Sequence, residues 1–125
     1  MKTLTIFYLN GNDSSIEAHY IEKEYRNDII IEKDNLFYEL HFFTHDSLEY
    51  EMTKDGFFSL PGLIILDEIS NEKIKTSIRT LAKKGFFESF KGRKQMFFEE
   101  RFSSFWYVKK AEISYSSLVE ERIEL

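Results

Sequence analysis

The chain has 125 residues, no cysteine and a net charge of −5. This length fits a single domain, residues 1–125, because separate hydrophobic cores rarely appear below about 200 residues. Without cysteine the chain forms no disulfide and offers no thiolate to a metal or a substrate. No apolar run approaches the roughly 18 residues of a membrane-spanning helix. Residues 1–9 are too short for the apolar region of a secretory signal, so we expect a cytoplasmic protein.

The N-terminal part of the chain has the pattern of antiparallel strands joined by turns. The first predicted strand is Thr3–Leu9, which is rich in β-branched and aromatic residues. Asn10–Asp13 has residues that tolerate positive φ and predicts a turn. Asp28–Glu32 predicts a second strand, and Lys33–Asn35 a turn into a third strand over Leu36–Thr44. In that third strand one face is apolar and the other is mixed, which is typical of a meander.

The segment Ile16–Tyr25, between these strands, carries conflicting signals. Ser14 and Glu17 have the spacing of a capping box, which favours a helix. Apolar residues also alternate with polar ones from Ile16 onward, which favours a strand. We predict a strand, because hairpin-like segments lie on both sides.

Only one helix is signalled consistently along the chain. After the apolar run Leu63–Leu66, which we predict to be a central strand, Ser70 is a good N-cap. Ile69 and Ile74 have the spacing of a hydrophobic staple, and Gly85 is placed to end the helix. An apolar stripe at helical spacing consists of Ile74, Ile78, Leu81 and Ala82.

The remaining segments are less defined. Asp46–Met52 either extends the hairpin before it or forms a turn. Gln95–Glu99 and Phe105–Tyr115 read as strands. Ser117 and Glu120 are spaced to cap a short C-terminal helix, although the tail could equally be frayed. The whole pattern predicts an α+β fold, a mostly antiparallel β-sheet (meander) with one main helix packed on one face.

No motif for catalysis or cofactor binding is present in the sequence. The glycines are scattered, and neither a phosphate-binding loop nor a nucleophile elbow occurs. On a strand, His41 and His45 would lie about 13 Å apart, beyond the reach of one metal ion. An acid/base role for His19, His41 or His45, paired with Glu39 or Asp46, is a chemical alternative. We predict no catalytic residue, no cofactor and no metal ligand, and therefore not an enzyme.

Charge is strongly segregated along the chain. Residues 1–72 carry 15 acidic and 5 basic residues, whereas residues 73–110 carry 11 basic and 3 acidic ones. The basic part interleaves cations with phenylalanines, as a nucleic-acid-binding surface does. Its members are Lys75, Arg79, Lys83, Lys84, Lys91, Arg93 and Lys94, with Phe86, Phe87 and Phe90. A nucleic-acid-binding module over residues 75–94 is therefore the alternative, although the acidic chain lacks the usual basic character.

The acidic half predicts a surface for a cationic protein partner, because complementary charge steers and orients association. If its carboxylates share one face, they form an acidic patch together with several tyrosines. The predicted partner-binding residues are Glu17, Glu22, Glu24, Asp28, Glu32, Asp34, Glu39, Asp46, Glu49, Tyr20, Tyr25, Tyr38 and Tyr50.

Residues 36–88 resemble small bacterial immunity proteins of contact-dependent or polymorphic toxin systems. The resemblance lies in a β-meander followed by the run Leu60–Ile69, and then a helix leading to Lys84-Gly85-Phe86-Phe87. It implies a small acidic protein that forms a heterodimer with a cognate toxin, for example a basic nuclease, and occludes its active or substrate-binding surface. No residue roles transfer, because no short motif defines these proteins. A homodimer through an exposed edge strand is also compatible with the pattern.

Overall fold

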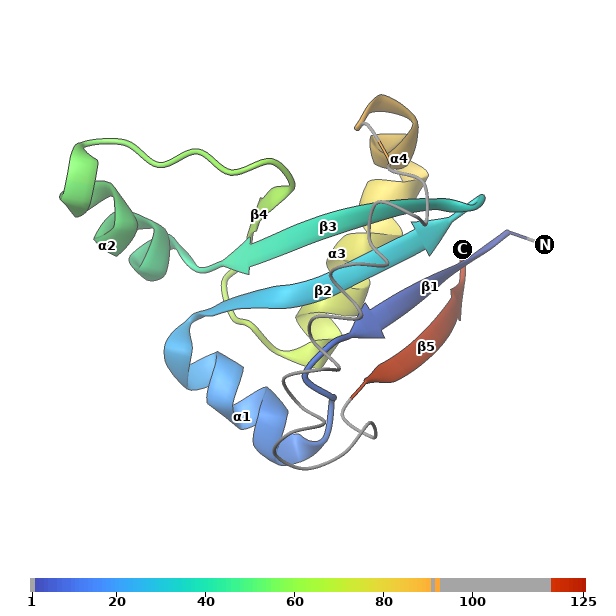
Figure 1. Ribbon diagram of the computed structural model, residues 1–125, viewed down its shortest axis with the longest axis horizontal. Coiled ribbons are helices and arrows are strands. Elements are labelled where there is room, and N and C mark those ends of the chain that lie inside the picture. The colour runs from blue at the N-terminus through green and yellow to red at the C-terminus, as the bar shows by residue number, and fades with distance from the viewer. Residues whose placement is uncertain (1, 91, 93–117) are drawn as a thin grey trace.

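In the computed structural model a five-stranded sheet is backed by a long helix (Figure 1). The structure describes residues 2–90, 92 and 118–125. The elements in chain order are β1 (Thr3–Tyr8), α1 (Ser14–Lys23), β2 (Tyr25–Lys33), β3 (Leu36–Phe43), α2 (His45–Asp55), β4 (Leu63–Ile65), α3 (Asn71–Lys83), α4 (Phe86–Ser89) and β5 (Val119–Glu124). None of these described helices is long and apolar enough to cross a bilayer.

The strands lie in the order β4-β3-β2-β1-β5. All neighbouring pairs are antiparallel except β3 and β4, which are parallel. The predicted α+β class is confirmed, and the sheet is mixed, with several helices. The hairpin between β2 and β3 turns through Asp34 and Asn35, which both have positive φ. Two such residues fit a two-residue hairpin turn, whose twist matches that of the strands.

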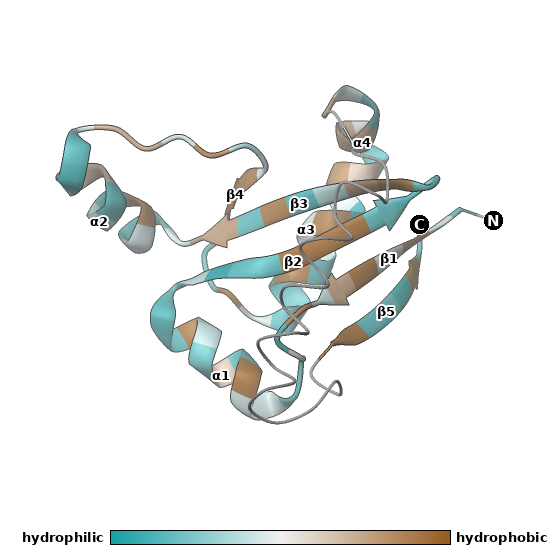
Figure 2. Ribbon diagram, viewed as in Figure 1, coloured by the Kyte–Doolittle hydropathy of each residue, from teal (hydrophilic) through white to brown (hydrophobic). Residues whose placement is uncertain are grey.

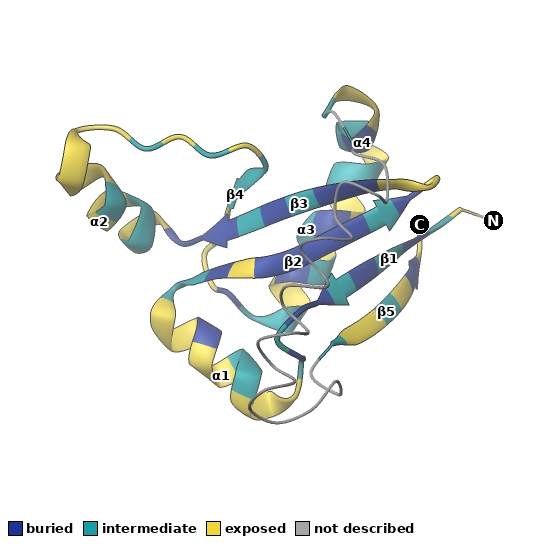
Figure 3. Ribbon diagram, in the orientation of Figure 1, coloured by how far each residue is buried: buried dark blue, intermediate teal, exposed yellow. Residues whose placement is uncertain are grey.

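The main core lies between the sheet and α3, on what we call the α3 face of the sheet. Alternate residues of each strand point toward this helix, since successive side chains of a strand point to opposite sides. The fully or almost fully buried members include Leu4, Ile6, Ile29, Ile31, Leu40, Phe42, Ile74, Ile78 and Ile123. The sheet therefore carries its most hydrophobic and most buried residues along β1, β2 and β3 (Figures 2 and 3).

A smaller cluster occupies the opposite face of the sheet. Leu9, Ile30 and Phe37 are buried there, and the partly buried Phe7 and Leu118 pack against them. The rings of Phe7 and Phe37 are stacked with centroids 6.1 Å apart. The same face also carries polar residues, so the mixed character predicted for the outer side of β3 is confirmed.

The prediction for α3 is confirmed in detail. Ser70 caps its N-terminus by accepting a hydrogen bond from the backbone N–H of Lys73, and Ile69 and Ile74 are both buried. The helix ends at Lys83, and Gly85 follows with a φ of 77°. Local signals and the apolar stripe agree here, which is why the sequence was sufficient.

The predicted strand over Ile16–Tyr25 is wrong, because most of this segment forms α1. Its N-cap is Asp13, whose side chain accepts from the backbone N–H of Ile16. Tyr20 is the one buried residue of α1, so the apolar alternation does not correspond to a buried strand face. Glu24 ends the helix with a φ of 63°, and the chain turns directly into β2.

Three further expectations need correction. Asp46–Met52 is helical, within α2. Leu63–Leu66 does not form a central strand, because β4 is short and is the terminal strand of the described sheet beside β3. The C-terminal helix or frayed tail is replaced by β5, which gains backbone partners from β1. The predicted strands Gln95–Glu99 and Phe105–Tyr115 lie outside the described residues.

Candidate functional site

The most concentrated polar cluster surrounds the side chain of Arg26, which is 0% exposed. Its Nε donates to Asp28 Oδ1 at 2.8 Å, and one terminal nitrogen donates to the Gly11 carbonyl at 2.7 Å and to Asp28 Oδ2 at 3.4 Å. The other terminal nitrogen donates to Asn12 Oδ1 and Asn71 Oδ1. These bonds engage every N–H group of the guanidinium. No donor remains to hold an anionic ligand.

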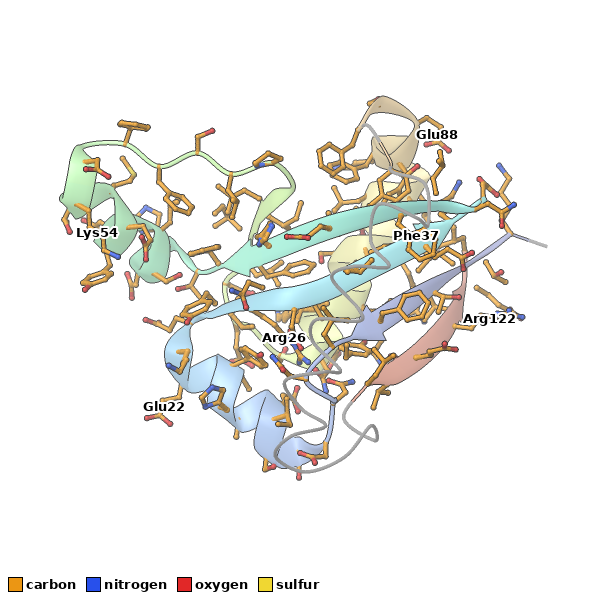
Figure 4. All side chains as sticks on the ribbon, viewed as in Figure 1. Glu22, Arg26, Phe37, Lys54, Glu88 and Arg122 are labelled. Carbon is orange, nitrogen blue, oxygen red and sulfur yellow. The ribbon has the colours of Figure 1, made fainter. Side chains whose placement is uncertain are left out.

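Two tyrosine rings complete the Arg26 cluster. The guanidinium carbon lies 4.5 Å from the centre of the Tyr20 ring and 5.1 Å from that of Tyr8. The Asn10 side chain donates to the Tyr20 hydroxyl, and its backbone N–H donates to Asp28. The cluster therefore joins the loop after β1, α1, β2 and the start of α3 (Figure 4). Its role is to hold these elements together.

His41 and Glu39 form the closest histidine–carboxylate pair in the described chain. They lie two residues apart on the same side of β3, with 3.0 Å between His41 Nε2 and Glu39 Oε1. Both side chains are partly buried. Such a pair can accept or donate a proton. Among the described residues, however, no hydroxyl group bonds to His41, so no activated nucleophile is assembled beside it.

One group of side chains in the described chain has metal-ligand spacing: His45, Asp46 and Glu49, at the start of α2. Their ligand atoms lie within 4.8 Å of one another, and all three residues are exposed. They belong to the first turns of a helix, whose positive end disfavours a cation. His41 lies in β3, so it does not join His45 in one site.

The predicted partner-binding tyrosines and carboxylates are distributed unevenly between interior and surface. Tyr20 and Asp28 belong to the Arg26 cluster and are buried. Tyr38 is buried too, and its hydroxyl donates to the Phe87 carbonyl. These three residues therefore do not lie on a docking surface. Tyr25 is half-buried and stacks on the ring of Phe43.

The predicted carboxylates of α1 and the sheet do not converge on one patch. Glu17 accepts a hydrogen bond from the backbone N–H of Asn71, at the start of α3. Glu22 is exposed on α1 and points away from the body (Figure 4). Asp34 lies in the β2–β3 turn, where the Lys33 side chain bonds to it. The remaining three are Glu24 at the end of α1, Glu32 in β2 and Glu39 in β3.

The structure brings Asp46, Glu49 and Tyr50 together on α2. Their spacing of three and four residues places them on one side of the helix. Tyr50 is 64% exposed, and Met52 in the same helix is 43% exposed. Phe57, just after the helix, is 68% exposed. We call these five residues the α2 surface. Met52 and Phe57 were not among the predicted residues. The sequence did hold a signal for them, because both are large apolar residues in or next to an acidic segment that ends at a glycine.

Among the described residues, hydrogen bonds anchor the first turn of α2 to the end of α1. Thr44 and Ser47 form a capping box, and the Ser47 hydroxyl donates to the Glu24 carbonyl at 2.6 Å. The backbone N–H of Thr44 donates to the same carbonyl. Beyond this anchor, α2 contains no buried residue, and it extends away from α3 past the end of β3 (Figures 1 and 3).

The basic segment is partly neutralised within the described chain. The Lys75 side chain bonds to Glu121 of β5, while Arg79 and Lys83 are exposed on α3. Phe86 packs against Phe87 and Phe90, and Phe87 is buried. Lys84 is also exposed, whereas Lys91, Arg93 and Lys94 lie outside the described residues.

Comparison with protein-family models, curated proteins and solved structures finds no match to this chain.

Proposed function

We propose that this chain is a non-enzymatic protein-binding module that docks a cationic protein partner on the α2 surface. We further propose that the partner is a bacterial toxin, such as a basic nuclease. The module would act as an immunity protein by occluding the active or substrate-binding surface of the toxin. The toxin part of the proposal rests on the resemblance of residues 36–88 to immunity proteins.

The observation that carries the proposal is the exposure of α2 in the described part of the chain. This helix has 11 residues and none of them is buried. Isolated helices of this length are marginal in water, and most helices in proteins are stabilised by packing an apolar side. Here Tyr50, Met52 and Phe57 remain in solvent instead. Aromatic residues and methionine are enriched at the centres of protein interfaces, which a bound partner would provide.

The charge of α2 indicates the kind of partner. The helix contains four acidic residues, Asp46, Glu49, Glu51 and Asp55, and its one fully cationic residue is Lys54. Lys54 is held within the helix by Glu51, at 3.1 Å. A surface of this kind attracts a basic partner, increases the rate of association and orients the complex.

The decisive experiment is binding of the purified protein to the product of the neighbouring gene, measured by titration calorimetry. Truncation of Tyr50 or Phe57 to alanine should weaken binding about 30-fold or more if they are central contacts. Glu49→Lys should also weaken binding, and it should reduce the association rate because it reverses a charge that attracts the basic partner. Glu22→Lys, an equal change of charge on exposed α1, is the matched control and should have little effect.

Two results would overturn the proposal. If the neighbouring product forms no complex and shows no toxicity, the immunity function is lost. If a complex forms but Glu49→Lys and Glu22→Lys weaken it equally, the α2 surface is not where the partner docks. Activity of the toxin in the presence of the wild-type protein then separates inhibition from mere binding.

Nucleic-acid binding by residues 75–94 is less well supported by the described residues. A single-strand binding surface needs exposed rings on which bases stack. Phe87 is buried, Phe86 and Phe90 pack against each other, and Lys75 is paired with Glu121. Absence of oligonucleotide binding at low salt would exclude this alternative, because phosphate contacts are strongest there.

A further inference from the structure

The strand β5 ends the described sheet on the side remote from β4. It pairs with β1 so that Glu121 lies opposite Ile6 and Ile123 opposite Leu4. The backbone N–H of Leu125 donates to the Lys2 carbonyl. In an antiparallel pair, residues bonded to the neighbour alternate with residues whose backbone groups face away. The odd-numbered residues of β5 therefore bond to β1, and the even-numbered ones direct their N–H and C=O groups outward.

This outward edge is six residues long and open in the described part of the chain. Glu120, Arg122 and Glu124 are exposed. Among the described residues, none pairs with the far side of β5. A row of unpaired backbone groups is a template for another strand. Edge strands are often protected by charge, so the sign and order of the charges decide whether this edge repels or selects a partner.

We propose that the partner of this edge is β5 of a second copy of the chain, running antiparallel about a two-fold axis at Glu121. In this register Glu120 lies opposite Arg122 of the second copy, and Arg122 lies opposite its Glu120. Val119 lies opposite Ile123. The interface is isologous, so each favourable pair occurs twice. Opposite charges directly across a strand pair are stabilising, as are facing apolar residues.

The charges select this register over its neighbours. Shifting the axis to Arg122 places that arginine opposite itself and Glu120 opposite Glu124. Shifting it to Glu120 places two glutamates in contact at the axis. Both alternatives also shorten the overlap of the two strands within residues 118–124. The register centred on Glu121 pairs this whole segment and matches its charges.

Glu121 is the one like-charged contact in the proposed register, and its charge is already balanced inside each chain. Its Oε2 lies 3.2 Å from Lys75 Nζ, and its Oε1 accepts a hydrogen bond from the Tyr8 hydroxyl at 2.8 Å. Two such neutralised carboxylates can approach across the axis. The α2 surface lies beyond β3 and β4, at the other end of the sheet, so dimer formation leaves it accessible.

Solution mass tests the dimer independently of the proposed function. Light scattering coupled to size-exclusion chromatography should give twice the mass of one chain for the wild type. Glu120→Arg should reduce the mass to that of a monomer, because two arginines then face each other. Arg122→Glu should do the same with two glutamates. The double variant E120R/R122E exchanges the pair and should restore the dimer, while Glu22→Arg on α1 should leave it unchanged.

A cysteine at the axis tests the register directly, because the chain contains no cysteine of its own. Residues facing each other in a non-hydrogen-bonded pair have Cα atoms about 4.5 Å apart, within disulfide range. Glu121→Cys should therefore form a covalent dimer on oxidation, whereas Glu120→Cys and Arg122→Cys alone should not. A monomeric wild type would overturn the proposal. So would a dimer that persists in both single charge variants or is lost in Tyr50→Ala.

Discussion

Arg26 and Asp28 form a buried ion pair within a single strand, with 2.8 Å between Arg26 Nε and Asp28 Oδ1. Residues two apart in a strand point to the same side. Here the register shifts between Arg26 and Ile29, and the irregular strand lets the carboxylate reach the guanidinium. Formation of this pair therefore costs little loop-closure entropy. The other members of the cluster come from distant parts of the chain.

Asp28→Ala should lower the free energy of unfolding by about 3–5 kcal/mol, since removal of one partner leaves a buried charge uncompensated. Urea denaturation measures this change. Adding Arg26→Met should recover part of the loss, because the orphaned charge is removed as well. Asp34→Ala is the control: Asp34 is exposed and Lys33 keeps its ion pair with Glu88, so the loss should be less than about 1 kcal/mol. If the double variant D28A/R26M lost as much unfolding free energy as the two single variants together, the destabilisation by Asp28→Ala would not come from an unpaired buried charge.

Stability should fall as the pH rises above about 10, where tyrosine normally ionises. Burial raises the pKa of Tyr8, Tyr20 and Tyr38, and the hydrogen bond to Glu121 raises that of Tyr8 further. Above the unfolded pKa the unfolded chain has released these protons while the folded chain retains them, so unfolding becomes more favourable. The stabilisation is complete below the unfolded pKa and is lost as pH approaches the raised folded values.

Denaturation midpoints measured between neutral and alkaline pH test this dependence. The hydrogen bond that Lys33 donates to Asp34 raises the pKa of Lys33, and this shift also makes stability fall as the pH rises. Tyr8→Phe should therefore make the alkaline decline shallower without abolishing it. A decline of unchanged steepness in this variant would show that Tyr8 is not among the groups responsible.

Gly62→Ala should destabilise the protein more than Gly56→Ala, although both glycines have a φ near 80°. A Cβ at position 62 would overlap the backbone carbonyl of Glu39, whereas a Cβ at position 56 meets nothing within 4 Å. The backbone penalty for the left-handed conformation is about 1 kcal/mol at either position. The difference between the melting temperatures of the two variants, measured by calorimetry, gives the extra cost of the overlap. Equal decreases in melting temperature would show that the overlap has no cost.

Ser47→Ala should weaken the anchor of α2 at the end of α1, leaving the bond from the Thr44 N–H to the Glu24 carbonyl. The variant loses the bond from Ser47 to the Glu24 carbonyl and half of the capping box with Thr44. Loss of a side-chain hydrogen bond of this kind costs about 1 kcal/mol. Hydrogen exchange of the α2 amides should accelerate while that of α3 stays constant. Thr53→Ala, in the last turns of the same helix, is the control that keeps the anchor.

Elements defined by local signals were predictable, and those defined by distant partners were not. Ser70, Ile74 and Gly85 supply a cap, a stripe and a terminator within one segment, so α3 was identified correctly. For β5, the pairing with β1 provides the backbone partners, and no local pattern contains that information. For α1, the cap is Asp13 rather than Ser14, and the apolar alternation was coincidental.

The candidate site was predictable to the extent that its residues are close in the sequence. Asp46, Glu49 and Tyr50 were predicted from an acidic and aromatic segment, and a helix places them on one side. Tyr20 and Tyr38 were expected on the same surface, but tertiary packing buries them. Arg26 was missed, because its burial depends on partners from three other elements. The two-residue spacing between Arg26 and Asp28 was the only local feature that indicated a pairing of these two side chains.

The hydrogen bond between Tyr8 and Glu121 spans 113 positions of the chain. During synthesis on the ribosome, β1 is therefore exposed long before its outer neighbour emerges. The hairpin of β2 and β3 can form early, because its contacts are local, whereas closure by β5 is delayed by loop entropy. Until then the apolar strand β1 has an unpaired edge, and nascent chains on neighbouring ribosomes could aggregate through it. The glutamate-rich composition of β5 suits a segment that must stay soluble until it docks.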